Sequence, residues 1–299
     1  MLASPYLADG APRYERTMHG WVDAPDEATF RIIARVVDPW VGVEVVAMTT
    51  PSPEYGIREA TARVLVGSSD RVDPGLTGPL AGLAGVPMTG GFTRRVAEAT
   101  GGRAGAPYVI DAAIEVARLA RQVTRLPGDL ITRHFAEGAV GIWRLDMQGW
   151  VDFPGSCYAF RPESERLFAG RTVVSPATVA LYGPRPGATR VFNRTKVARI
   201  EGLGDRWLLG HSMFDEVHSL QVWYVVDPEA ATIVDAGSLT PRLPYQGVCS
   251  DVQPRIREMV GQRLDAGLRK RMGSLIGGAT GCAQLYDLTA DLLKLLTLA

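Results

Sequence analysis

The feature that most constrains the fold is a pattern that recurs in the two halves of the chain. The stretch FTRRVAEATGGRAGAPYVIDAAIEVARLA can be laid over LRKRMGSLIGGATGCAQLYDLTADLLKLL, so that three glycines coincide and later charges keep their signs. The coinciding pairs are Arg95 with Arg271, Gly101 with Gly277, Gly102 with Gly278, Gly105 with Gly281, Asp111 with Asp287, Glu115 with Asp291, Arg118 with Lys294 and Leu119 with Leu295. Two unrelated helices with glycine-rich starts are the alternative, but the shared spacing favours an internal repeat.

The stretches before these segments alternate apolar and polar residues, as half-buried strands do. In the first half they are ATFRIIARVVD and YGIREATARVLVG. In the second half we expect three strands, in KVARIEGLGDRWLLGHSMFD, HSLQVWYVVDPE and ATIVDAGSLT. Gly204-Asp205 and Asp227-Pro228 mark turns there. Helical patterns follow, and the last one places a stripe of leucines on one face.

Each half therefore predicts a small antiparallel sheet followed by helices. We expect an α+β fold built by tandem duplication, with a pseudo-twofold axis between two similar units. The predicted organisation is a first copy over residues 1–123, a connecting segment over 124–194 and a second copy over 195–299. The composition of the connecting segment favours short strands and loops. We expect its aromatic residues to pack on the copies and form one wall of a cleft; they are Trp143, Trp150, Phe153, Tyr158, Phe160 and Phe168.

Charge and cysteine content exclude several classes of protein. Lys+Arg and Asp+Glu both number 32, so no net charge attracts nucleic acid or an anionic membrane. No apolar run approaches the ~20 residues of a membrane helix, and the N-terminus lacks the pattern of a secretory signal. Three cysteines in a chain of this length do not form a disulfide framework. We expect a cytoplasmic protein with reduced thiols and a small-molecule substrate, and a homodimer stays open.

Two cysteine motifs in the second half resemble the motifs of a known family. Pro244, Tyr245 and Cys249 form a step after the last predicted strand, and Gly277, Gly278, Gly281, Cys282 and Leu285 form a closing motif. Through these motifs, residues of about 195 to 296 resemble a bacterial domain family of unknown function, number 2889. The family pattern has histidine where this chain has Gln284, and glutamate where it has Asp287, which weakens any inherited argument for metal binding.

The order of strands, cysteine, helices and second cysteine is also similar to the iron–sulfur scaffold proteins of the NifU and IscU type. This likeness is one of topology and cysteine placement, so it bears on the fold more than on the function. If that topology holds, Cys249 approaches Cys282, and the two thiols with His211, Asp215 or His218 could hold a metal or cluster. The spacing matches no close metal-binding signature, and we expect no cofactor.

Cys282 is the first candidate for chemistry. It lies at the start of the last predicted helix, where unpaired N–H groups and the helix dipole favour an anion and can lower a thiol pKa. Such a thiol can act as a nucleophile; the alternative is a small buried side chain that fills space. The first copy has Ala106 at this position, so only one copy could carry thiol chemistry. Cys157 is interpreted as a structural or pocket residue.

His211 and His218 flank the stretch SMFDEV, and we expect a turn near Asp215. Either histidine could act as a general base, with Asp215 assisting; the alternative is an exposed histidine at a strand end. Arg271 and Arg95 precede the two sets of glycines and could hold a carboxylate or a phosphate, unless they belong to solvated helix faces. Further candidates for substrate contact are Cys249, Tyr245, Gln284 and Trp150.

These residues lead to three hypotheses about function. The first is a bacterial enzyme acting on a small apolar or aromatic acid or thioester, such as a lyase, isomerase or hydrolase of aromatic compound catabolism. In it, Cys282 reacts with help from His211, His218 and Asp215, and no redox cofactor is needed because no dinucleotide motif is present. The second is a metal or iron–sulfur scaffold that uses Cys249 and Cys282. The third is a non-catalytic module that binds a small molecule.

Overall fold

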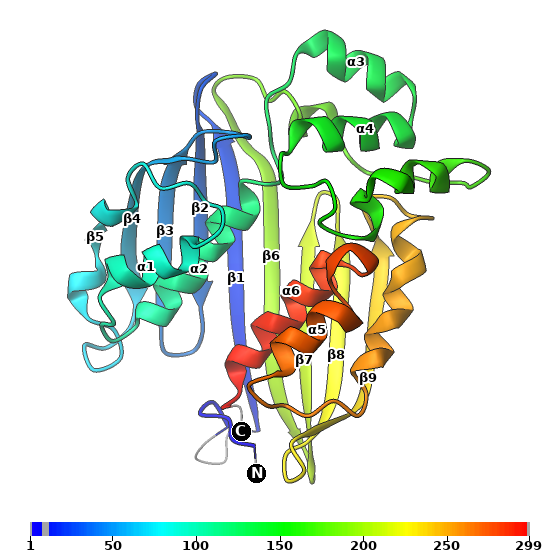
Figure 1. Cartoon of the computed structure of the whole chain (residues 1–299). Helices are drawn as coiled ribbons and strands as arrows, with labels where there is room; N and C mark the ends of the chain where they lie inside the picture. The colour runs from blue at the N-terminus through cyan, green and yellow to red at the C-terminus, as the bar shows by residue number, and fades with distance from the viewer. Residues whose placement is uncertain (1, 8–11, 298–299) are drawn as a thin grey trace.

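A single nine-stranded antiparallel sheet runs through the computed structural model, which describes residues 2–7 and 12–297 (Figure 1). The strand order is β5-β4-β3-β2-β1-β6-β7-β8-β9. The strands are β1 (Arg13–Ala24), β2 (Phe30–Val37), β3 (Gly42–Thr49), β4 (Ile57–Val66), β5 (Gly78–Pro79), β6 (Ala188–Leu203), β7 (Arg206–Asp215), β8 (Ser219–Asp227) and β9 (Thr232–Arg242). Each half of the chain thus contributes a four-stranded meander, the first half adds the two-residue edge strand β5, and β1 and β6 join the two meanders.

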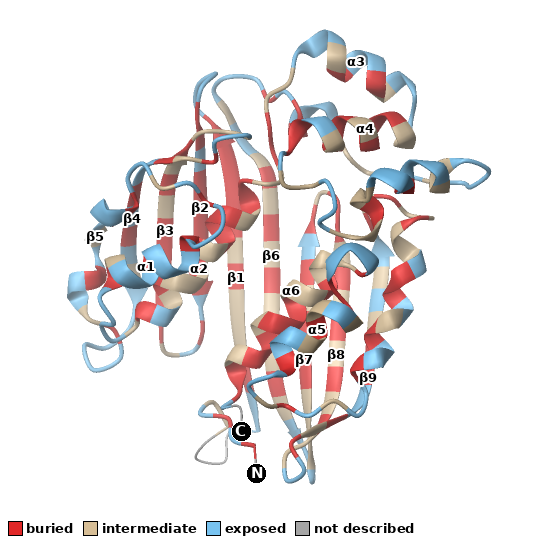
Figure 2. Cartoon of the chain, in the orientation of Figure 1, coloured by how far each residue is buried: buried red, intermediate tan, exposed pale blue. Residues whose placement is uncertain are grey.

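The pairing of β1 with β6 makes the sheet continuous. These are the two longest strands, and their register runs from Arg13 opposite Glu201 to Val22 opposite Phe192. Buried and partly exposed residues alternate along β6 (Figure 2), because successive side chains of a strand point to opposite faces. One face of the sheet is therefore buried, and it is mostly apolar, although β6 places Arg194 and Lys196 on it.

Helices from both halves cover this face. Figure 1 shows α1 (Phe92–Thr100) and α2 (Ala106–Leu119) lying across the first meander, and α5 (Leu268–Leu275) and α6 (Ala283–Leu292) across the second. The remaining short 3-10 segments of the two halves are η2 (Pro74–Leu76), η3 (Ala81–Leu83), η7 (Cys249–Met259), η8 (Gly278–Thr280) and η9 (Leu293–Leu295). The expected α+β class is confirmed.

Three strands of the first half were not predicted, and one predicted strand of the second half is a hairpin. The stretches predicted as strands correspond to β2 and β4, while β1, β3 and the two-residue β5 were not expected. In the second half, the first quoted stretch contains the end of β6 and all of β7, with the turn at Gly204-Asp205 between them. The second half therefore has four strands where three were expected.

The connecting segment is helical, which corrects the prediction of short strands and loops. It forms α3 (Gly128–Ala136), α4 (Ala139–Gly149), η4 (Tyr158–Phe160), η5 (Pro162–Phe168) and η6 (Val179–Leu181) before β6 begins at Ala188. In α4 the buried residues Ile142, Leu145 and Gly149 follow helical spacing, but the aromatic neighbours made the stretch look β-like. The expectation that its aromatic residues pack on the rest is met, since Trp143 and Trp150 are buried in the first core.

The interior consists of two apolar clusters. The first joins α1, α2 and the connecting segment to the first meander, and the second lies between α5, α6 and the second meander. Trp40 and Cys249 pack against both clusters. Within the described residues, the structure contains no helix whose length and apolar character would let it cross a membrane.

Candidate functional site

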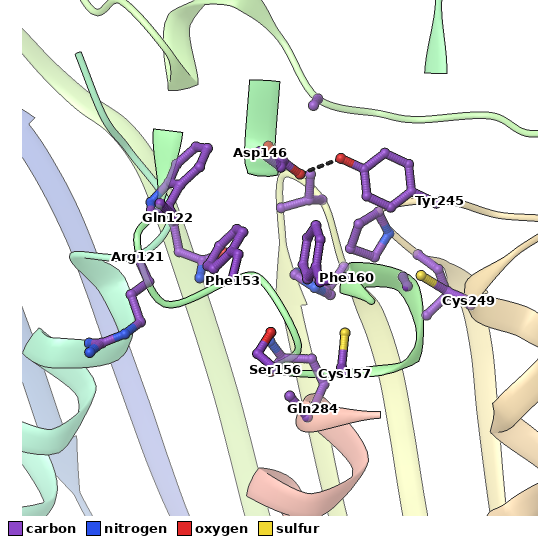
Figure 3. A pocket seen from close by; sticks show the side chains of 18 of the residues that line it. Arg121, Gln122, Asp146, Phe153, Ser156, Cys157, Phe160, Tyr245, Cys249 and Gln284 are labelled. Atoms are coloured by element: carbon purple, nitrogen blue, oxygen red, sulfur yellow. Dashed lines mark hydrogen bonds between the residues drawn. The ribbon is translucent and has the colours of Figure 1, made fainter. Parts of the chain in front are cut away.

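A cavity of about 260 Å³ lies where the connecting segment meets the second half of the chain (Figure 3). Its walls come from the end of α2, from α4 and the loop after it, from the turn after β7, from the segment after β9 and from the start of α6. Residues far apart in the sequence therefore line one space. The candidates Trp150, His218, Tyr245, Cys249, Cys282 and Gln284 are all among them.

One wall of the cavity is aromatic. Trp150 and Phe153 stack with ring centroids 4.9 Å apart, and Phe153 stacks on Phe160 at 4.6 Å. The ring of Phe160 meets Tyr245 edge-on at 6.0 Å. Offset and edge-on packing of this kind fixes ring positions and leaves flat apolar surface toward the cavity. Such a wall suits an aromatic or otherwise flat apolar molecule.

All three cysteines are free thiols, and all three line this cavity. Cys282 is the N-cap residue of α6, and Cys249 begins η7 after β9. Cys157 comes from the loop before η4, and its backbone neighbour Tyr158 donates an N–H to the carbonyl of Gly281, 2.9 Å away. The structure therefore brings Cys249 and Cys282 to one cavity, as the sequence predicted, and adds Cys157.

Burial reverses the expected direction of the thiol pKa values. It raises the pKa of Cys282, although the backbone N–H of Leu285, the side chain of Gln253 and the N–H of Gln284 act in the opposite direction. Burial likewise raises the pKa of Cys157 to about 11 and that of Cys249 well above its ordinary value. The helix start does favour the thiolate of Cys282, but removal from water outweighs it. All three are thiols, not thiolates, near neutral pH.

His218 lies at the cavity with an acidic partner. The Nδ1 atom of His218 is 3.0 Å from Oδ1 of Asp215, and the backbone N–H of His218 donates to the same oxygen at 2.6 Å. The guanidinium of Arg194 donates from Nε to Oδ2 of Asp215 at 2.8 Å. Burial alone would raise the pKa of Asp215, but His218 and Arg194 outweigh it and hold that pKa well below the ordinary value. An ionised Asp215 fixes the ring of His218 and favours a proton on Nδ1.

A second polar group at the cavity was not predicted. Asp146 on α4 receives two hydrogen bonds, from the hydroxyl of Tyr182 at 2.5 Å and from the hydroxyl of Tyr245, the latter drawn in Figure 3. Burial raises the pKa of Asp146 to about 7, although both tyrosine hydrogen bonds lower it. In the sequence the signal was a lone carboxyl in the apolar stretch GIWRLDMQGW, on the face that α4 buries.

The arginines at the cavity differ from those expected. Arg121 lines it, with its guanidinium held by the carboxylate of Asp152 and by the carbonyls of Ala117 and Met88. Arg95 instead lies on the exposed face of α1 beside Glu98, at 3.6 Å. These positions correct the expectation that Arg95 holds the anionic end of a substrate.

Two further candidates also lie elsewhere. Arg271 on α5 donates to Gln262 and Asp265, both at 3.0 Å, and does not line the cavity. His211 on β7 is buried under α6, where its Nδ1 lies 2.9 Å from the carbonyl of Leu288. Burial lowers the pKa of His211 to about 4, so it is a neutral core residue, not a base at the cavity.

His211 borders a cluster of buried charges between α2, α6 and β6. The ammonium of Lys196 lies 2.6 Å from the carboxylate of Glu115 and 3.7 Å from that of Asp291. The guanidinium of Arg118 contacts Asp291 at 2.7 Å. Opposite charges thus alternate through the cluster, which compensates for their removal from water.

The glycines of the repeated pattern do not share one conformation. Gly102 and Gly278 both have positive φ, at 65° and 62°. Gly105 has φ 82°, whereas Gly281 has φ −127° and is required for another reason: a Cβ there would lie 2.3 Å from the carbonyl oxygen of Ile276. The second set of glycines therefore serves close backbone packing at the start of α6, and no phosphate-binding loop is needed to explain it.

The three thiols and His218 raise the question of a metal ion at the cavity. Across residues 2–7 and 12–297, no three or more His, Cys, Asp and Glu side chains are placed so that they could hold one. The three thiols come from three different segments of the chain.

Comparison with known families bears on the second half of the chain. The family model described as a protein of unknown function, DUF2889, matches residues 209–297. The match contains Tyr245, Cys249 and Cys282, so the resemblance read from the two cysteine motifs is confirmed for this region. No curated protein and no solved structure matches the chain. The first copy and the likeness to iron–sulfur scaffolds stay predictions.

Proposed function

We propose that this protein is an enzyme that acts on a small, largely apolar or aromatic acid or thioester held in the cavity. The reaction is of the lyase, isomerase or hydrolase type and uses His218 as general base, with Cys282 as the thiol that reacts with the substrate. The observation that carries the proposal is the pairing of His218 with Asp215 at the edge of an aromatic cavity.

The Asp215–His218 pair has the arrangement that general-base catalysis requires. Asp215 contacts Nδ1, and among the described residues no group hydrogen-bonds to Nε2 of His218. A neutral ring with its proton on Nδ1 presents Nε2 as an acceptor for a proton. Asp215 stabilises the imidazolium that forms when Nε2 takes that proton, as an acidic partner does in catalytic triads.

The state of Cys282 supports a role that depends on a base. Because burial keeps its thiol protonated, Cys282 cannot act as a free thiolate at neutral pH. A nucleophilic thiol of this kind has to lose its proton during the reaction, and His218 lines the same cavity. The position at the N-cap of α6 then stabilises the thiolate once it forms.

The test is a screen of small aryl acids, aryl esters and aryl thioesters for turnover by the wild-type protein. His218→Gln should lower kcat by at least about 100-fold, the usual contribution of a general base, and Cys282→Ala should do the same for substrates attacked by the thiol. His19→Gln is the matched control, because His19 lies on β1 and not at the cavity. Equal rates for His218→Gln and wild type would contradict the proposal.

Two alternatives from the sequence give different results in the same experiments. A non-catalytic binding module would bind aryl ligands without turning any of them over, and His218→Gln would change affinity alone. A scaffold that uses Cys249 and Cys282 would carry metal or show a charge-transfer absorption after anaerobic purification. We expect a colourless protein, because the donor placement described above does not favour a cluster.

We also propose that the two halves arose by tandem duplication. Two observations support this: each half has a four-stranded meander followed by helices, and β1 and β6 pair at the centre of the sheet. Ion pairs between α2 and the segment formed by α6 and η9 add support. Arg118 of α2 pairs with Asp287, and their counterparts in the repeat, Lys294 and Asp111, pair with each other across the same junction. The three free thiols are typical of a reducing compartment, so we place the protein in the cytoplasm.

A further inference from the structure

Asp146 differs from the other buried carboxylates because no cation accompanies it. Every other buried Asp or Glu among the described residues has a nitrogen of Arg or Lys within 4.0 Å. Within residues 2–7 and 12–297, the hydroxyls of Tyr182 and Tyr245 are the only hydrogen-bond partners of the Asp146 side chain. Burying a lone carboxylate is costly, and such a group takes up a proton instead. The raised pKa of Asp146, about 7, agrees with this.

The number of protons in this cluster decides what it can do. With Asp146 ionised, both tyrosine hydroxyls donate to its oxygens and no hydroxyl hydrogen is left over. With Asp146 protonated, its carboxyl and the two tyrosines carry three O–H hydrogens, but only two hydrogen bonds join these three groups. One O–H is then free to donate. Since Asp146, Tyr182 and Tyr245 all line the cavity, a bound molecule can receive it.

Trp150 supplies a second donor beside this cluster. Its indole ring meets the ring of Tyr182 edge-on, with centroids 5.4 Å apart, and only 2% of the residue is exposed. The indole N–H of Trp150 is buried without a hydrogen-bond partner among the described residues. A buried donor of this kind costs free energy unless something accepts its hydrogen. A ligand oxygen in the cavity would do so.

We infer that Asp146, Tyr182, Tyr245 and Trp150 form a donor site for an uncharged oxygen acceptor, the carbonyl of an aryl ketone, ester or thioester. The inference rests on the proposed function, because it assumes an apolar ligand in the same cavity, and it names the chemical group that such a ligand presents. Protonated Asp146 keeps the site in its donating state. Ionisation of Asp146 removes the spare hydrogen of the cluster, so at higher pH only the indole N–H of Trp150 still donates to the acceptor and the acceptor is held more weakly.

The groups that act on the Asp146 carboxyl are few. They are the hydroxyls of Tyr182 and Tyr245 and, more weakly, the thiol of Cys249, whose own pKa Asp146 helps to raise. The two tyrosines have pKa values well above the ordinary one because of burial. Asp146 is therefore the group that titrates in this cluster near neutral pH.

The test uses two ligands of one shape: acetophenone, which has a carbonyl, and α-methylstyrene, in which a CH2 group replaces that oxygen. Calorimetry at pH values about one unit below and one unit above the pKa of Asp146, about 7, gives both affinities. Wild type should prefer acetophenone about three- to tenfold at the lower pH, as one added hydrogen bond does, and the preference should shrink at the higher pH, where only the indole N–H of Trp150 still donates. Asp146→Asn should keep it at both values, because an amide does not ionise.

Asp152→Asn is the matched control, since Asp152 lines the same cavity but is paired with Arg121; it should behave like wild type. Equal affinity of wild type for both ligands at both pH values would overturn the donor site and leave the apolar cavity standing. A pH dependence that persists in Asp146→Asn would overturn the role of Asp146. Failure of both ligands to bind would overturn the apolar ligand class of the proposed function and the donor site with it.

Discussion

The guanidinium of Arg118 on α2 lies 3.1 Å from the carboxylate of Asp287 on α6. The reciprocal contact joins Lys294, in η9 directly after α6, to Asp111 on α2, at 2.8 Å. Asp111 and Asp287 coincide in the sequence repeat, as do Arg118 and Lys294. The two helices thus exchange equivalent charges across the junction between the halves, and this junction is where charge substitutions should have their largest effect on stability.

Glu115→Leu should lower the free energy of unfolding by about 3 kcal/mol, the lower end of the range for breaking a buried ion pair. It leaves the ammonium of Lys196 buried, with only Asp291 at 3.7 Å for compensation. Adding Lys196→Met should recover most of the loss. Urea unfolding measures both, with Glu98→Gln as control, because Glu98 forms only exposed pairs. A double variant no more stable than Glu115→Leu would contradict this.

Lowering the pH from about 6.5 to about 4 should destabilise the fold through His211. Its folded pKa, about 4, lies below the ordinary value of 6.5 because the ring is buried, so the unfolded chain binds this proton first. The stabilisation that neutral His211 contributes is fully present above pH 6.5 and is lost as the pH falls through the folded pKa. The loss amounts to at most about 3 kcal/mol. In His211→Asn this part of the pH dependence should be absent, as the difference between the two unfolding curves would reveal.

In the same experiment, the free energy of unfolding should depend on pH in the opposite direction through Asp146. Its folded pKa is raised, so the folded chain binds the proton first and the contribution is full below the ordinary value of 3.8. It is lost as the pH rises towards 7. Asp146→Asn should therefore gain stability relative to wild type between pH 4 and 7. A difference between wild type and Asp146→Asn that does not change with pH would show that Asp146 is not protonated in the fold.

Two glycines of the second half should respond to alanine with opposite signs. Gly281→Ala places a Cβ 2.3 Å from the carbonyl oxygen of Ile276, and this backbone contact should cost about 1–3 kcal/mol. Gly273 lies within α5 with open space around it, so Gly273→Ala should stabilise the protein by about 0.5–1 kcal/mol. Thermal unfolding compares the pair directly, and a stabilising Gly281→Ala would refute the packing argument.

Iodoacetamide should label Cys282 in the folded protein more slowly than free cysteine at neutral pH, because burial raises its pKa and limits access. Cys157 should be equally slow, with a pKa of about 11. Labelling after unfolding provides the control, since all three thiols should then react alike. Fast labelling of Cys282 in the folded state would instead support a thiolate that needs no base.

The sequence predicted those parts of the structure in which side-chain polarity follows burial. The alternation in β8 and the leucine stripe of α6 are such cases, because their buried faces are apolar. The expected order of strands and cysteines also brought Cys249 and Cys282 to one cavity. Pattern reading failed for β1 and for the beginning of β6. There Arg16 and Lys196 pair with carboxylates of α2, and Arg194 is buried against Asp215 on the neighbouring strand β7.

The candidate site was less predictable, because its members meet only through the tertiary fold. Asp146 on α4 accepts a hydrogen bond from Tyr245 in the segment after β9, and no pattern in either stretch of sequence predicts this contact. Arg95 and Arg271 looked like ligands for an anion because they recur in the repeat, but both lie on surfaces away from the cavity. Recurrence of a residue reflects shared architecture, whereas the cavity is built where the two halves differ.

The continuity of the nine-stranded sheet has a consequence for how this chain can be divided. The family match begins at Leu209, inside β7, and so leaves out β6, which pairs with β7 along its whole length. A fragment cut at that point would present an unpaired strand edge, which invites aggregation. We expect residues 209–297 to be insoluble when expressed alone and the whole chain to unfold in one cooperative transition. The segment that the family model covers and the unit that folds are then of different size.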